Sequence, residues 1–96
     1  MERDTIQSSD HATTVDLWIE GRFRTVTVTR LAIEARLKLT PSEAEALSAE
    51  DRTQFVKANL GLVMQIAKAL LRLKGTSTNE IVIGPAELGS KEAQGT

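Results

Sequence analysis

Cysteine and tyrosine are absent from this chain of 96 residues, which has one histidine, two prolines and three aromatic side chains. Without cysteine there is no disulfide framework, no thiol nucleophile and no thiolate metal site. One histidine leaves the common zinc and facial-triad ligand sets out of reach within a single chain. That histidine, His11, has no potential partner residues clustered near it in the sequence, so we expect it to be solvated. We therefore expect neither a metal nor a cofactor.

Long apolar runs are missing as well. The most apolar stretch, residues 55–73, contains polar or charged side chains throughout its length, which makes it too polar for a lipid-spanning helix. The first ten residues are polar and net acidic, whereas a secretory signal has a basic start followed by an apolar run. The sequence predicts a cytoplasmic protein that makes no membrane contact.

No arrangement of residues typical of catalysis is recognisable. The serines have no base placed beside them in a nucleophile elbow, and no glycine-rich phosphate loop is present. Pairs of acids such as Asp16 and Glu20 are typical of a solvated surface, because acid–base catalysis also needs a pocket that shifts their pKa values. We expect the protein not to be an enzyme.

Two runs of alternating side chains, residues 14–20 and 23–29, predict a β-hairpin. A turn at residues 21–22 would place Val15 opposite Val28 and make one side of the hairpin apolar. Helix-start signals then predict two short helices over residues 30–39 and 41–47, a long helix over residues 48–74 and a last strand over residues 80–84. These signals are the cap Thr29, the run Thr40-Pro41-Ser42-Glu43, and Ser48 followed by Asp51.

This order of elements predicts a small two-layer α+β fold. A three-stranded antiparallel sheet would consist of the hairpin and the C-terminal strand, which would pair with the first strand. The two short helices and the long helix would lie on one face of the sheet. We expect a single domain over residues 13–88, with flexible tails over residues 1–12 and 89–96.

The predicted long helix is apolar over an arc of about 220°, although a helix that lies on a sheet needs a stripe of little more than about 100°. The excess can be covered by the two short helices or by a second copy of the chain. Candidate interface residues on the arc are Val63, Ile66, Leu70 and Leu71. Asn59 also lies on the arc, where its amide would bond to neighbouring backbone or fix the register of a helix contact.

Two of the aromatic residues, Trp18 and Phe23, fall on the side of the hairpin opposite its apolar side. Two aromatics close together among polar residues indicate a protein contact surface. The other interpretation is that a tail or a loop covers them.

Charge is balanced overall, with 12 Lys and Arg against 13 Asp and Glu, but it is segregated along the chain. Residues 52–79 carry five basic residues and no acid, and acidic blocks such as residues 41–51 lie elsewhere. Lys57, Lys68 and Arg72 share the polar strip of the predicted long helix and form a possible nucleic-acid contact. A solvated helix face is the alternative, because the strip is thin and no aromatics interleave with it.

The chain resembles the small bacterial proteins catalogued as domain of unknown function 1488. The resemblance lies in residues 15–21 (Val-Asp-Leu-Trp-Ile-Glu-Gly), in residues 26–29 (Val-Thr-Val-Thr), in Glu34-Ala35, in Phe55, and in Ile81-Val82-Ile83 followed by Glu87-Leu88. The resemblance implies a compact α+β fold, and the family has no established activity.

Taken together, the sequence predicts a non-catalytic small bacterial protein-interaction or regulatory module that self-associates as a homodimer or binds another protein. Its contact residues would be Trp18, Phe23 and the four apolar residues of the long helix. The alternative is a mobile-element or regulatory accessory protein that contacts nucleic acid or a nucleoprotein complex through the basic helix face.

Overall fold

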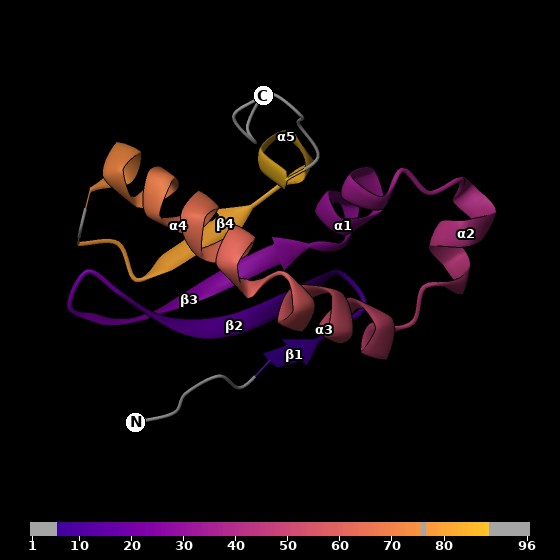
Figure 1. The fold of residues 1–96 in the computed structure, drawn as a ribbon, viewed down its shortest axis with the longest axis horizontal. Coiled ribbons are helices and arrows are strands. Elements are labelled where there is room, and N and C mark those ends of the chain that lie inside the picture. Colours follow the sequence, from indigo (N-terminus) through magenta and orange to yellow (C-terminus); the bar gives the residue numbers. More distant parts are fainter. Residues whose placement is uncertain (1–5, 76, 89–96) are drawn as a thin grey trace.

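The computed structural model describes residues 6–75 and 77–88, and their sheet has four strands. The strands are β1 (Ile6–Ser8), β2 (Ala12–Ile19), β3 (Arg22–Thr29) and β4 (Glu80–Ile83), and they lie in that order across the sheet (Figure 1). The α+β class is confirmed.

The predicted arrangement of the sheet needs two corrections. The C-terminal strand β4 pairs with β3, and it runs parallel to it rather than antiparallel to the first strand of the hairpin. The edge of β2 that it was expected to join is occupied by β1, which lies in the segment assigned to the flexible N-terminal tail. Four helices separate β3 from β4, and such a long crossover is what a parallel pair requires. The predicted tail over residues 89–96 lies outside the described residues.

The hairpin turn is formed by Glu20 and Gly21, with φ of 52° and 88°. Two successive residues with positive φ are typical of a type I′ turn, whose twist matches that of the two strands. The turn therefore lies one residue earlier than predicted, and Val15 pairs with Val26 rather than with Val28. Because side chains alternate with period two, this shift of two residues leaves every side chain on its predicted face.

The predicted helix starts are confirmed by their capping hydrogen bonds. Helix α1 (Arg30–Leu37) is capped by the hydroxyl of Thr29, which accepts from the backbone N–H of Ala32. Helices α2 (Pro41–Ala46) and α3 (Ala49–Ala58) each begin with a reciprocal capping box. The partners in the two boxes are Thr40 with Glu43, and Ser48 with Asp51.

The predicted long helix is interrupted at Asn59, which separates α3 from α4 (Leu60–Lys74). Asn59 has φ −121° and ψ 28°, and its side-chain amide donates to the carbonyl of Phe55 at 2.8 Å. This bond to nearby backbone is the first of the two roles expected for Asn59. Asparagine and Gly61 both have low helix propensity, which favours a break here. Helix α4 ends at Lys74, as predicted, with Gly75 as its C-cap, and a short helix α5 (Pro85–Leu88) follows β4.

Helices α1, α3, α4 and α5 pack on one face of the sheet, and the core lies between the two layers (Figure 1). Helix α2, which was also predicted to lie on this face, is placed to the side of the sheet. Alternate residues of β2, β3 and β4 supply the sheet side of the core, and α4 supplies a row of residues four apart along the helix. The main contributors are Val15, Leu17, Ile19, Val26, Val28, Ile33, Val56, Val63, Ala67, Leu71, Ile81, Ile83 and Leu88.

Candidate functional site

The face of the sheet turned away from the helices is not covered by any described helix or strand. We call it the open face. No side chain at its strand positions is buried, whereas the alternate positions of β2, β3 and β4 are buried, apart from Arg22 at the start of β3. The open face consists of Gln7, Ala12, Thr14, Asp16, Trp18, Phe23, Thr25, Thr27, Thr29, Glu80 and Val82.

Trp18 and Phe23 are direct cross-strand partners at the turn end of the hairpin. Their ring centroids are 5.0 Å apart with an interplanar angle of 83°, an edge-to-face pair. Such pairs are favourable beyond the area they bury. The pair leaves Trp18 58% exposed, a large fraction for the largest apolar side chain. The two aromatics thus lie together on the open face, at the place where the alternation of the strands predicts them.

Acidic side chains lie next to the aromatic pair on the same face. The register places Asp16, Thr25 and Glu80 in one row across three strands, and the hydroxyl of Thr25 donates to Asp16 at 3.0 Å. With a strand spacing of about 4.8 Å, the row extends over about 10 Å. No Lys or Arg occupies a described strand position of the open face, so the charge that its side chains carry is negative.

Helix α4 does not present the four predicted interface residues together. Val63 and Leu71 are buried in the core, so assigning them to an interface was wrong. Ile66 and Leu70 are half-buried and pack against the core. The apolar arc of this helix is therefore covered largely by its own sheet, and only part of it remains accessible.

The solvent side of α4 carries an apolar side chain that the sequence analysis did not single out, Leu73, which is 82% exposed. Leu73 lies four residues after Ala69 on the same side of the helix. Beside it are Lys68 and Arg72, which are also one helical turn apart. We call this surface the α4 outer strip, and its exposed members are Gln65, Lys68, Ala69, Arg72 and Leu73.

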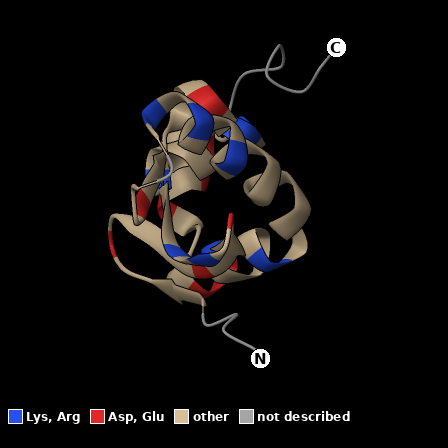
Figure 2. Cartoon of the chain, turned by 90° about the vertical axis from the view of Figure 1, so that its left-hand side faces the viewer, with Lys and Arg blue, Asp and Glu red and all other residues tan. Residues whose placement is uncertain are grey.

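The three basic residues predicted to share one strip are all exposed, but they lie on two helices. Lys68 and Arg72 are one turn apart on α4, whereas Lys57 lies on α3, before the break at Asn59. Figure 2 shows several blue segments along the helices at the top of the molecule. The side chains of the three residues form no hydrogen bond or ion pair with other described residues.

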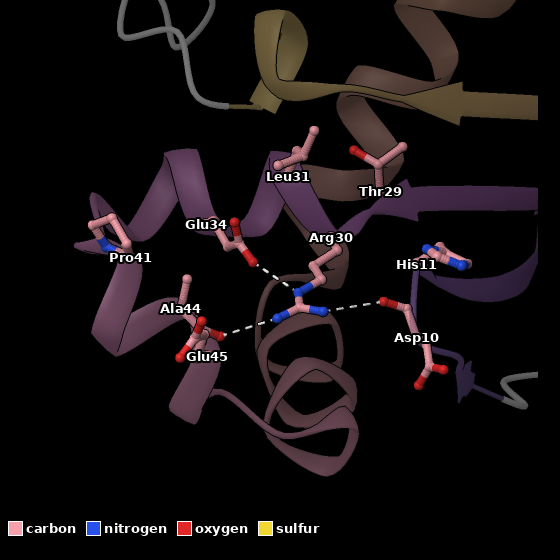
Figure 3. Close-up of a pocket in the computed structure, with 9 residues that line it drawn as sticks. All are labelled: Asp10, His11, Thr29, Arg30, Leu31, Glu34, Pro41, Ala44 and Glu45. Atoms are coloured by element: carbon pink, nitrogen blue, oxygen red, sulfur yellow. Dashed lines mark hydrogen bonds and ion pairs between the residues drawn. The ribbon is translucent and has the colours of Figure 1, made fainter.

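A cavity of about 530 Å³ lies between the start of β2, α1 and α2 (Figure 3). Arg30 points into it, and its guanidinium bonds to Glu34 at 2.8 Å and to the carbonyls of Asp10 and Ala44 at 3.4 Å each. Because all three nitrogens are directed at groups of the protein, we interpret Arg30 as a clamp between these segments rather than as a ligand-binding residue. His11 also lines the cavity and is exposed.

Two arginines are buried, and neither was predicted from the sequence. Arg24, 2% exposed, donates to the carbonyls of Ile19 at 2.8 Å and Glu20 at 3.3 Å, and also to that of Thr78. Its position in the alternation, two residues before Val26, is the signal that places it among inward-pointing residues. Arg52 is 3% exposed and donates to the carbonyl of Ala12 at 3.5 Å; its Nε has no hydrogen-bond partner among the described residues.

Over residues 6–75 and 77–88, no three His, Asp or Glu side chains are grouped as metal ligands. Within the same residues, no helix has the length and apolar character needed to cross a membrane. The chain matches no protein-family model, no curated protein and no solved structure. The resemblance to domain of unknown function 1488 stays a prediction.

Proposed function

We propose that the protein is a non-catalytic cytoplasmic interaction module that self-associates through the open face. The observation that carries the proposal is the aromatic pair, because Trp18 is more than half exposed while it is held in a fixed orientation by Phe23. Tryptophan is among the residues that contribute most to protein interfaces, and a rigid aromatic loses little conformational entropy when it binds.

The composition around the pair also favours a protein partner. Threonines on β2 and β3 give a flat surface with small side chains, and the exposed Val82 adds an apolar contact on β4. Apolar anchors among polar groups are typical of interfaces between proteins that also exist separately. We therefore expect a contact that forms and dissociates readily.

Sedimentation velocity on the full chain tests this function. Between about 10 and about 500 µM, where small interfaces of less than about 1,200 Å² show their association, the wild-type protein should shift from monomer toward larger species. Trp18→Ser should weaken this association by about tenfold or more. Circular dichroism should show an unchanged fold, because the side chain is exposed.

Leu31→Ser is the matched control, since Leu31 is 64% exposed but lies on α1, away from the open face. It removes an exposed apolar side chain of similar accessibility and should leave association unchanged. A wild-type chain that stays monomeric over the whole range contradicts self-association. If Trp18→Ser associates as strongly as the wild type, the open face is not the contact.

A second candidate function is contact with nucleic acid or a nucleoprotein complex through Lys57, Lys68 and Arg72. It is favoured by the exposure of all three side chains and by the absence of acids from residues 52–79. The test is fluorescence anisotropy with a labelled random-sequence DNA duplex and a labelled RNA. If each residue contacts one phosphate, the logarithm of the duplex affinity should fall with the logarithm of salt concentration with a slope of about −2.7.

Replacing these three residues by Gln should abolish that binding while the fold is retained. The control replaces three cations elsewhere by Gln, namely Arg22, Arg36 and Lys38, so that the net charge changes equally. Equal loss in both variants would show that only the overall charge matters. Binding that does not depend on salt would contradict contact with phosphates.

A further inference from the structure

We propose that the occupant of the open face is the α4 outer strip of a second copy of the chain, bound head to tail. This inference rests on the proposed function and names the partner surface. It comes from two surfaces on opposite sides of the molecule, the acidic open face of the sheet and the basic strip on the solvent side of the helical layer.

Charge complementarity is the first argument. The open face carries Asp16 and Glu80 and has no described Lys or Arg at its strand positions, while the α4 outer strip carries Lys68 and Arg72 and no acid. The charged side chains at these described positions thus have opposite signs on the two surfaces. Complementary charges across an interface accelerate association and exclude wrong pairings.

Apolar complementarity is the second argument. The open face offers the partly exposed rings of Trp18 and Phe23 and the side chain of Val82, and the α4 outer strip offers Leu73. Beside Leu73, the small side chain of Ala69 lets the helix approach an aromatic ring closely. Each surface therefore combines an exposed apolar side chain with charges of a single sign.

The dimensions of the two surfaces agree. Helix α4 has 15 residues and is about 22 Å long at about 1.5 Å per residue. The hairpin strands β2 and β3 have eight residues each and are about 26 Å long at about 3.3 Å per residue, so the helix fits along them. A docked helix would give the sheet a second helical layer and cover the face that its own helices leave exposed.

A symmetric pairing of two open faces is disfavoured by the same charges. It would bring Asp16 and Glu80 of both copies to one interface without any cation from the strand positions. The head-to-tail contact is heterologous, so a dimer keeps one unused open face and one unused α4 outer strip, and the assembly can grow beyond a dimer.

Two charge-changing variants test the arrangement. The sheet variant combines Trp18→Lys with Glu80→Lys, and the helix variant combines Lys68→Glu with Arg72→Glu; all four positions are exposed, and circular dichroism checks the fold. By sedimentation velocity the mass of the wild type should rise beyond that of a dimer with concentration. Raising the salt from about 0.05 to about 0.5 M should reverse this rise, because salt screens exposed charges. Each variant alone should associate at least about tenfold more weakly.

The mixture of the two variants is the decisive measurement. The sheet variant retains a native α4 outer strip, and the helix variant retains a native open face. A one-to-one mixture should therefore associate at concentrations where neither variant does so alone. Lys38→Glu with Lys57→Glu is the control for the helix variant, because it changes the net charge by the same amount at exposed sites off α4 and should associate like the wild type.

Each possible result has a definite consequence. A mixture that stays monomeric overturns the head-to-tail contact. If only the sheet variant loses association and the helix variant behaves as the wild type, the open face is a self-association surface but α4 is not its occupant. If neither variant differs from an associating wild type, both this inference and the use of the open face for self-association are wrong. If the wild type itself is monomeric, the proposed self-association is wrong as well.

Discussion

Replacing Arg24 by methionine should lower the free energy of unfolding by about 3 kcal/mol. The guanidinium is almost fully buried and donates to three backbone carbonyls, two at the hairpin turn and one in the loop before β4. Hydrogen bonds from a charged donor contribute about 1.5 to 3 kcal/mol each. Three such bonds sum to about 4.5 kcal/mol or more, and the penalty for burying the charge offsets part of this sum, which leaves a net loss of about 3 kcal/mol.

Urea titration followed by circular dichroism and by the fluorescence of Trp18, the single tryptophan, measures this loss. Thermal unfolding gives a second measure. A change of 1 kcal/mol shifts the melting temperature of a domain of this size by about 4 to 8 °C, so the melting temperature of the variant should fall by about 12 °C or more. Arg22→Met is the control, because Arg22 lies on the same strand, is exposed and donates to the side chain of Asn79 at 3.0 Å. It should cost less than about 1 kcal/mol. If Arg24→Met costs no more than Arg22→Met, the carbonyl contacts of Arg24 do not stabilise the fold as argued.

The same urea titration checks two further predictions. Leu71→Ala should cost about 2 to 5 kcal/mol, because Leu71 is 1% exposed, whereas Leu73→Ala, at an 82% exposed position of the same helix, should cost less than about 0.5 kcal/mol. Equal losses at the two positions would contradict the assignment of the inner and outer sides of α4. Glu20→Asn should stabilise the protein by about 0.5 kcal/mol, because asparagine before Gly21 favours the positive φ of a type I′ turn. A destabilised Glu20→Asn variant would show that the Glu20 side chain makes a contact worth more than the turn preference.

The local chemistry of the sequence accounts for most of the elements. Capping residues predicted where α1, α2 and α3 begin, since their bonds are formed within three residues and need no tertiary partner. Alternation predicted both strands of the hairpin and the face of every residue in them, including the open-face position of the Trp18 and Phe23 pair. The two-residue error in register left these faces intact because it was even.

The errors concern contacts between distant segments. The pairing of β4 depends on which edge of the hairpin is free, and that edge was taken by β1, a strand of three residues too short to give a periodic pattern. The wide apolar arc of α4 could not be divided into an inner and an outer side from sequence, because Leu71 and Leu73 are the same residue type. Arg24 was missed because a buried arginine depends on carbonyls from a turn and from a loop more than fifty residues away.

The edges of the sheet are less suited to association than its open face. The outer strands β1 and β4 have three and four residues, and β4 begins with the charged Glu80 and is followed closely by Pro85. Short edge strands, charges and prolines are features that discourage pairing with another chain. On the open face, the threonines alone would suit a sheet that simply remains in water, because one solvated face is common in antiparallel sheets. Trp18 and Val82 differ from these threonines, because polar side chains would be better solvated at both positions. Their exposure is the reason to place the contact on the face of the sheet rather than at its edge.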